Sequence, residues 1–267
     1  MCSSCYYNPL KNHYFKNKTA LHLAVGAWGV LILLVWLLPV SFCGYLNDDL
    51  DTGFWYFLSE SGGVYGTTVL AIVLCGAAAS QQVGARQQVR AFAAGFGFLL
   101  LTLGGIAILN EYGIKPLMQL PRPSHQFLLG EGQADVLPQF YLKSVPERQA
   151  YLESHIQVNA EKYAAISPLV LSHWVAESGS SFPSGHSQNA FLLATMLVFW
   201  LCLQLPARKQ GWCLLPMGWA TLVCLSRVAL GVHSELDVSL GAGFGLLLAY
   251  LLSLTGLLHR IFRITQP

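Results

Sequence analysis

Three segments of the chain combine basic residues, histidines and turn-forming residues in patterns suited to holding a phosphoryl group. They are Lys115–Pro123, Pro183–His186 and Ser226–Asp237. Arginine presents a planar fork that matches phosphate oxygens, and lysine acts as a point charge. Lys115, Arg122 and Arg227 are therefore candidate phosphate-binding residues.

The second segment, Pro183-Ser184-Gly185-His186, precedes an apolar stretch and is expected to begin a helix. The unpaired backbone N–H groups and positive dipole end of a helix start form an anion site. Gly185 allows the backbone to approach the anion closely. Ser184 and Gly185 therefore join the three cations in a predicted cage that stabilises a phosphoryl-transfer transition state.

Two histidines and one carboxylate complete this set. His233 and Asp237 lie four residues apart, so they share one helical face if a helix starts there. Asp237 would then fix the tautomer of His233 and support its positive charge, as a nucleophile requires. His186 would donate a proton to the departing oxygen as general acid.

The elements that position these residues are predicted to be membrane-spanning helices. Of the 267 residues, 54% are hydrophobic and 10% are charged, with a mean hydropathy of +0.49, whereas soluble domains are about 25% charged. Six apolar stretches approach the roughly 20 residues that a spanning helix needs. We expect an all-α integral membrane protein, a single membrane-embedded domain over residues 1–267, with six transmembrane helices at Ala24–Phe42, Gly62–Ala79, Ala91–Asn110, Ala190–Leu205, Trp212–Leu230 and Val238–Leu258.

The distribution of charge predicts the orientation. With both termini in the cytoplasm, nine of the 15 basic residues fall on the cytoplasmic side, as the positive-inside rule requires; they are Lys11, Lys16, Lys18, Arg86, Arg90, Arg208, Lys209, Arg260 and Arg263. All three polar segments then emerge on the outer face. The long polar insertion between the third and fourth helices, about 111–187, is expected to form an extracytoplasmic, partly helical cap with a helix at Pro146–Ala165.

The order and spacing of the three segments resemble the signature of the type 2 phosphatidic acid phosphatase superfamily, Lys-x6-Arg-Pro, Pro-Ser-Gly-His and Ser-Arg-x5-His-x3-Asp. The resemblance implies that His233 is the nucleophile and His186 the acid, and that no metal or other cofactor is used. It implies a lipid phosphatase whose partners are its membrane lipid phosphate and the bilayer, with no nucleic acid and no obligate protein partner. In bacterial members the substrates include phosphatidylglycerol phosphate and undecaprenyl pyrophosphate. The implied location is the bacterial inner membrane, with the site facing the periplasm.

Three alternatives remain open. A lipid phosphotransferase would use the same phosphohistidine with another acceptor. An anion transporter would place its site near the bilayer midplane, between repeated halves that this chain lacks. A vanadate-dependent haloperoxidase shares the cage, but those enzymes are soluble.

Other polar residues have structural interpretations. His173 and Trp174 are as consistent with anchoring at the membrane interface as with substrate contact. His125 and His155 are expected to be solvated loop residues. Gly241 and Gly245 predict a close-packing helix face.

Overall fold

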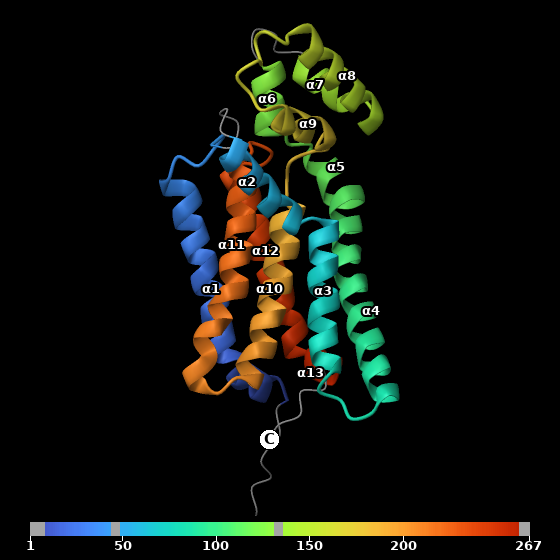
Figure 1. The fold of residues 1–267 in the computed structure, drawn as a ribbon, viewed down its shortest axis with the longest axis vertical. Helices are drawn as coiled ribbons and strands as arrows, with labels where there is room; N and C mark the ends of the chain where they lie inside the picture. Colours follow the sequence, from blue (N-terminus) through green and yellow to red (C-terminus); the bar gives the residue numbers. More distant parts are fainter. Residues whose placement is uncertain (1–8, 44–48, 131–135, 262–267) are drawn as a thin grey trace, which may run out of the picture.

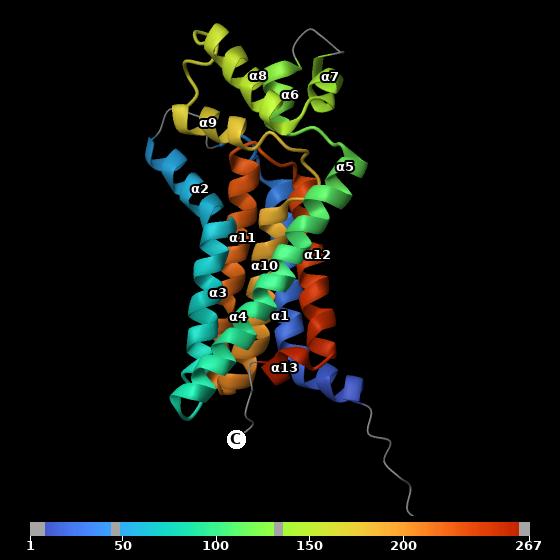
Figure 2. The same cartoon turned by 90° about the vertical axis from the view of Figure 1, so that its right-hand side faces the viewer.

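The computed structural model describes residues 9–43, 49–130 and 136–261, and these parts contain helices and no strands. Residues 1–8 and 262–267, which the sequence places in the cytoplasm, lie outside the described residues. Helices α1, α3, α4, α10, α11 and α12 form a bundle, and a group of short helices caps one end of it (Figures 1 and 2). The elements are α1 (Pro9–Leu37), α2 (Asp49–Ser61), α3 (Val64–Ala79), α4 (Ala85–Leu109), the π-helix η1 (Asn110–Ile114), α5 (Lys115–Met118), α6 (Pro123–Leu129), α7 (Val136–Leu142), α8 (Val145–Val158), α9 (Pro168–Ala176), α10 (Gly185–Gln204), the 3-10 helix η2 (Ala207–Cys213), α11 (Leu214–Ala229), α12 (Glu235–Leu254) and α13 (Leu257–Ile261).

Five helical stretches in the described chain are long and apolar enough to cross a membrane: Lys18–Leu37, Ala85–Met118, Gly185–Gln204, Arg208–Ala229 and Glu235–Leu254. A sixth is obtained only if α2 and α3, which meet at a 58° bend, count as one span. The first helix ends at Leu37 rather than Phe42, because the residue before a proline, here Pro39, is disfavoured in helical conformation.

Helix α2 was not expected from the sequence. Helix α3 alone has 16 residues, or about 24 Å at 1.5 Å per residue, which is less than the roughly 30 Å hydrocarbon core. The helical path breaks at Gly62 and Gly63 and continues as α2, which packs against α11, where Trp219 Nε1 donates to Ser61 Oγ at 3.0 Å. Because of this arrangement, Ser59 on α2 lies at the capped end of the bundle.

Helix α4 runs further than the predicted end at Asn110. It passes through η1 into α5 and ends at Met118, so Lys115 extends from the same continuous helix. Asn110 Nδ2 donates to Gln188 Oε1 on α10 at 2.5 Å, and both side chains are buried. This polar contact joins the cap-side end of a mostly exposed helix to the centre of the bundle.

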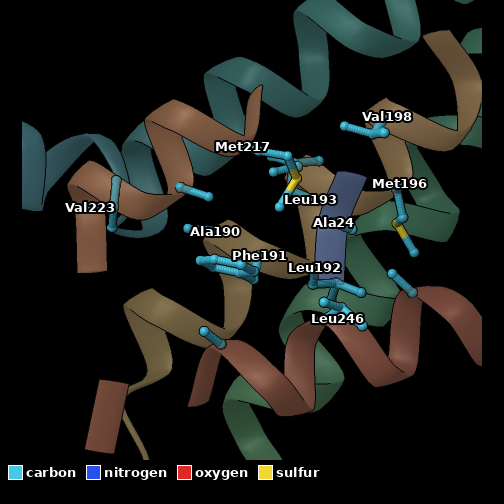
Figure 3. Close-up of a cluster of buried hydrophobic side chains, with 14 of the residues drawn as sticks. Ala24, Ala190, Phe191, Leu192, Leu193, Met196, Val198, Met217, Val223 and Leu246 are labelled. Atoms are coloured by element: carbon cyan, nitrogen blue, oxygen red, sulfur yellow. The ribbon is translucent and has the colours of Figure 1, made fainter. Parts of the chain in front are cut away.

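The bundle core surrounds α10, whose residues from Ala190 to Phe199 pack against α1, α11 and α12 (Figure 3). Gly241 and Gly245 of α12 lie directly against α10. A Cβ atom at Gly241 would be 2.7 Å from the Ser184 carbonyl oxygen, and one at Gly245 would be 2.1 Å from that of Gln188. The predicted close-packing face is therefore confirmed, and it fixes the start of α10 against the start of α12.

The cap has its own hydrophobic cluster, which includes Phe140, Leu152, Tyr163 and Trp174. Helix α8 ends at Val158, so the prediction of a helix through Ala165 was too long. Asn159 explains the stop, because its side-chain amide donates to the carbonyl of His155 at 2.8 Å and caps the helix.

Candidate active site

The three polar segments of the sequence meet where the cap sits on the bundle. Arg227 is in the last turn of α11, His233 lies in the short connection to α12, and Asp237 is in the first turn of α12. The segment that holds Arg122 follows α5, and Ser184 caps the start of α10. The backbone N–H of Ser184 donates to the Asp237 carbonyl at 3.2 Å, which ties the second segment to the third.

His233 is buried and oriented from both sides. Its Nδ1 lies 3.3 Å from Ser181 Oγ, and Ser181 Oγ donates to Asp237 Oδ2 at 2.5 Å. These partners place the proton on Nδ1 and leave the Nε2 lone pair toward Arg122 Nη1, 3.2 Å away. Burial, with the charge of Arg122, lowers the pKa of His233 to about 3 despite Asp237. The ring is therefore neutral at physiological pH, as a nitrogen nucleophile must be.

Asp237 is connected to His233 through the Ser181 hydroxyl rather than directly. The predicted direct contact is 3.7 Å long, from His233 Nδ1 to Asp237 Oδ2, and Ser181 bridges the two side chains. Asp237 Oδ2 also accepts the backbone N–H of Ser234 at 2.8 Å in a capping box that begins α12. Asp237 therefore both starts the helix and, through Ser181, anchors the His233 ring.

Arg122 uses its guanidinium to join several segments. Nε donates to the Gly179 carbonyl at 2.8 Å and Nη1 to the Val232 carbonyl at 3.0 Å. Nη2 forms an ion pair with Glu177 Oε2 at 2.8 Å, and the side chain is almost fully buried. This network holds one guanidinium edge next to His233 Nε2.

Arg227 is also fully buried and faces the same carboxylate. Nη1 donates to Ser59 Oγ at 2.5 Å and lies 3.2 Å from His173 Nε2, while Nη2 pairs with Glu177 Oε1. Its Nε has no hydrogen-bond partner among the described residues. A buried donor without a partner is costly, so this N–H is a ready contact for an anion.

Glu177 is the main site residue that the sequence analysis missed. It caps the C-terminal end of α9, and its two carboxylate oxygens bind the two arginines, one each. Burial raises the pKa of Glu177, but the charges of Arg227 and Arg122 outweigh burial and hold it well below its usual range. A carboxylate with two oxygens shared between two guanidinium groups has the charge and shape of part of a phosphate.

The start of α10 supplies backbone donors at the same place. Ser184 Oγ accepts from the N–H of Ser187 and from its hydroxyl, at 3.4 and 2.9 Å. Gly185 and His186 occupy the first two helical positions, where N–H groups have no acceptor within the helix. The His186 ring lies against α3, since a Cβ at Gly63 would be 3.2 Å from its Nε2. Arg227, Glu177 and His233 lie within electrostatic range of this ring.

Lys115 lies beside the cluster formed by Arg122 and Arg227 and is not part of it. The structure brings Arg122 and Arg227 to one carboxylate, whereas Lys115 Nζ pairs with a different one, Glu111 Oε2, at 2.7 Å. Lys115 also lines a pocket of about 180 Å³ beside Gly179 and Ser180.

The remaining histidines and the tryptophan have defined environments. His173 is buried against Arg227, and burial followed by that charge lowers its pKa to about 4. Trp174 is buried and donates to the Leu230 carbonyl at 2.6 Å, which fixes the loop before His233. The expectation that His125 is solvated was wrong: it is buried, and its Nδ1 lies 2.7 Å from Tyr141 Oη. His155 is partly buried and lies 3.1 Å from Tyr163 Oη.

Comparison with known proteins covers the part of the chain that holds these residues. The family described as the PAP2 superfamily matches residues 92–259, which include all three segments. The chain belongs to the PAP2 superfamily. The matched region begins within α4 and contains the cap, α10, α11 and α12, so the family assignment rests on the part of the chain that builds the site.

Curated relatives carry the name phosphatidylglycerophosphatase B. The chain is 42% identical to the Bacillus subtilis protein over 80 residues, which cover 29% of this chain and 39% of that protein. It is 33% identical to the Escherichia coli K12 protein over 147 residues, 53% of this chain and 54% of that protein. The Haemophilus influenzae protein is 28% identical over 218 residues, 77% and 85% of the two chains. The chain thus spans about half or less of the first two relatives. The apolar helices and these relatives indicate a bacterial membrane protein.

Proposed function

We propose that the chain is a lipid phosphate phosphatase that acts through a phosphohistidine at His233. The observation that supports this most directly is the Glu177 carboxylate held between Arg122 and Arg227, with Arg122 Nη1 also 3.2 Å from His233 Nε2. An anionic group with two oxygens already binds the two guanidinium groups that would hold the phosphoryl group. The family and the names of the relatives agree with this activity.

In the proposed first step, the substrate phosphate displaces Glu177 from the two guanidinium groups. Its oxygens then accept from Arg122, from the unpartnered Nε of Arg227 and from the N–H groups of Gly185 and His186. These donors are fixed before the substrate arrives, so little reorganisation is needed as charge develops on the oxygens.

The chemistry then follows two in-line displacements. His233 Nε2 attacks phosphorus, a P–N bond forms, and the bond from phosphorus to the lipid oxygen breaks as His186 donates its proton to that oxygen. Ser181 and Asp237 stabilise the positive charge of the phosphorylated ring. In the second step His186 accepts a proton from water, the water oxygen attacks phosphorus and the P–N bond breaks. Inorganic phosphate then leaves, and neutral His233 and protonated His186 are restored.

The proposed substrates are phosphatidylglycerol phosphate and undecaprenyl pyrophosphate. Both are lipids with a terminal phosphate at the level of the headgroups, and the site lies where the cap meets the apolar helices (Figure 2). The relatives' name specifies the first of these lipids for those proteins.

The proposed topology has six spans, with the bent α2–α3 pair as one, both termini in the cytoplasm of a bacterial cell, and the cap in the periplasm. The start of α4 and helix α13 lie at the end of the bundle opposite the cap (Figures 1 and 2), and these elements include Arg86, Arg90 and Arg260. This separation of basic residues from the site supports an extracytoplasmic active site in the inner membrane.

Purified protein in detergent tests the proposal. We expect release of inorganic phosphate from at least one lipid phosphate, in EDTA as well as without it, and loss of that release in Arg227→Gln. The absence of release from phosphatidic acid, phosphatidylglycerol phosphate and lipid diphosphates by folded protein would contradict it. Transfer of the substrate's phosphate to a lipid alcohol instead of water would indicate a phosphotransferase.

A further inference from the structure

Tyr141 on α7 holds the first turn of α6, and the two helices pack together in the cap (Figure 2). Tyr141 Oη accepts the backbone N–H of Arg122 at 3.0 Å and lies 2.7 Å from His125 Nδ1. Arg122 is the N-cap of α6 and His125 comes three residues later, so both lie on one face of the helix. A cap helix therefore contacts the backbone of the residue whose guanidinium lies 3.2 Å from His233 Nε2.

The direction of these two hydrogen bonds follows from the burial of His125. Burial, followed by the charge of Arg122, lowers the pKa of His125 to about 3, so the ring is neutral at physiological pH. Burial also raises the pKa of Tyr141, so its hydroxyl keeps its proton. Among the described residues, His125 Nδ1 is the one acceptor that this hydroxyl contacts. Tyr141 therefore donates to His125 and accepts from Arg122, and one hydroxyl satisfies both groups of the turn.

Tyr141 is itself fixed from its other side by Arg148 of α8. Arg148 Nη2 donates to the Tyr141 carbonyl at 2.5 Å, and the guanidinium centre lies 4.9 Å from the centroid of the Tyr141 ring. Arg148 Nη1 donates to the Ser178 carbonyl at 3.3 Å. Ser178 precedes Gly179, whose carbonyl accepts from Arg122 Nε at 2.8 Å. Arg148 thus joins the two segments that hold the backbone and the side chain of Arg122.

The hold on the Arg122 backbone matters most when the ion pair with Glu177 is broken. In the proposed reaction the substrate phosphate takes the place of Glu177, so the Gly179 and Val232 carbonyls remain as acceptors for the guanidinium. The bond from the Arg122 N–H to Tyr141 then fixes the point from which the side chain extends. Such a bond affects catalysis, because a misplacement of about 1 Å can cost roughly 10²-fold in rate.

We propose that Tyr141, oriented by His125 and Arg148, is a positioning residue for Arg122 in phosphoryl transfer. The inference rests on the proposed phosphatase function and adds a role for the cap, whose helices α7 and α8 fix the cation beside the nucleophile. Tyr141 needs no contact with the substrate for this role. Loss of its hydroxyl should therefore slow the chemical step without weakening substrate binding.

Tyr141→Phe tests the inference because it removes one hydroxyl and keeps the ring beside Arg148. Tyr163→Phe is the matched control, since Tyr163 is a buried cap residue whose Oη lies 3.1 Å from His155 Nε2 and donates to the Leu128 carbonyl at 3.2 Å, at the other end of α6. We expect a lower melting temperature in both variants. Only Tyr141→Phe should lose kcat, by about 10-fold, with KM unchanged.

Substitutions of His125 test the same hydrogen bond from its other end. Asparagine offers an amide oxygen that can accept from the Tyr141 hydroxyl, whereas leucine offers no acceptor. His125→Leu should therefore lose kcat as Tyr141→Phe does, and His125→Asn should keep more of the wild-type kcat. Equal kcat in the two His125 variants would contradict the orienting role of this residue.

Binding of vanadate and of inorganic phosphate, measured by thermal shift, needs no turnover. Vanadate resembles the phosphoryl group in the transition state, so Tyr141→Phe should weaken its binding about 10-fold and that of phosphate much less. Tyr163→Phe should change neither. A wild-type kcat in Tyr141→Phe, or equal losses of kcat in Tyr141→Phe and Tyr163→Phe, would overturn the positioning role. Failure of the phosphatase proposal is distinct, because the wild type would then release phosphate from no lipid while vanadate binding would still separate the two variants.

Discussion

Replacing Glu177 with glutamine tests whether this carboxylate competes with the substrate for the arginines. Glutamine has nearly the same shape, but it offers one neutral oxygen where Glu177 offers two charged ones to Arg122 and Arg227. A pair of opposite charges about 4 Å apart near a protein surface is worth about 4 kcal/mol before desolvation. Burial offsets much of that value, and a hydrogen bond to a charged group contributes about 1.5–3 kcal/mol net.

The ligand-free state of Glu177→Gln should therefore lose about 1–2 kcal/mol of internal interaction that the ligand-bound state does not contain. The variant should then bind vanadate about 5- to 30-fold more tightly, because a difference of about 1–2 kcal/mol in binding free energy corresponds to that factor in Kd. Its melting temperature should be lower than that of the wild type without ligand and should rise more when vanadate is added.

Competitive inhibition by vanadate and thermal unfolding with and without vanadate measure both effects. Glu153→Gln, on the exposed side of α8, is the control for loss of a cap carboxylate. Weaker vanadate binding in Glu177→Gln, with an unchanged melting temperature, would refute the reasoning. Glu177 would then hold the two arginines in position for the phosphate rather than compete with it.

Three other predictions concern the mechanism and the topology. His186→Ala should lose roughly 10²–10⁴-fold activity on a lipid phosphate but much less on nitrophenyl phosphate, whose leaving group needs no proton; equal losses in a phosphate-release assay would argue against a general acid. Ser181→Ala should lower kcat about 10- to 100-fold, since it removes a hydrogen bond to a charged carboxylate; an unchanged kcat would mean that Asp237 acts without the bridge. In a background without native cysteines, a cysteine at Glu153 should react with an impermeant thiol reagent added to spheroplasts and one at Gln87 should not; the reverse labelling would invert the topology.

The sequence predicted the parts of the site that depend on local pattern. Arg122, Arg227 and His233 come together as expected, because each lies at a fixed distance from the end of a long apolar segment. The packing of α12 on α10 through Gly241 and Gly245 also followed from their spacing. The proposed roles of these residues remain predictions.

Other features depended on tertiary contacts that no local pattern encodes. Glu177 reaches the arginines because α9 folds back over the bundle, and Ser59 reaches Arg227 because α2 bends by 58° from α3. Ser181 bridges His233 and Asp237 only because the segment before α10 lies against the start of α12. His125 looked like a loop residue because its partner Tyr141 comes from a different cap helix.

Direct detection of the phosphorylated residue tests the central claim. Protein mixed with a lipid whose terminal phosphate carries ³²P is quenched with alkali after a short time and digested, and the labelled peptide is sequenced. The account predicts label that is stable in alkali, labile in acid and located on His233, with none in His233→Ala although that variant folds. Label on another residue, or phosphate release by His233→Ala at the wild-type rate, would contradict it.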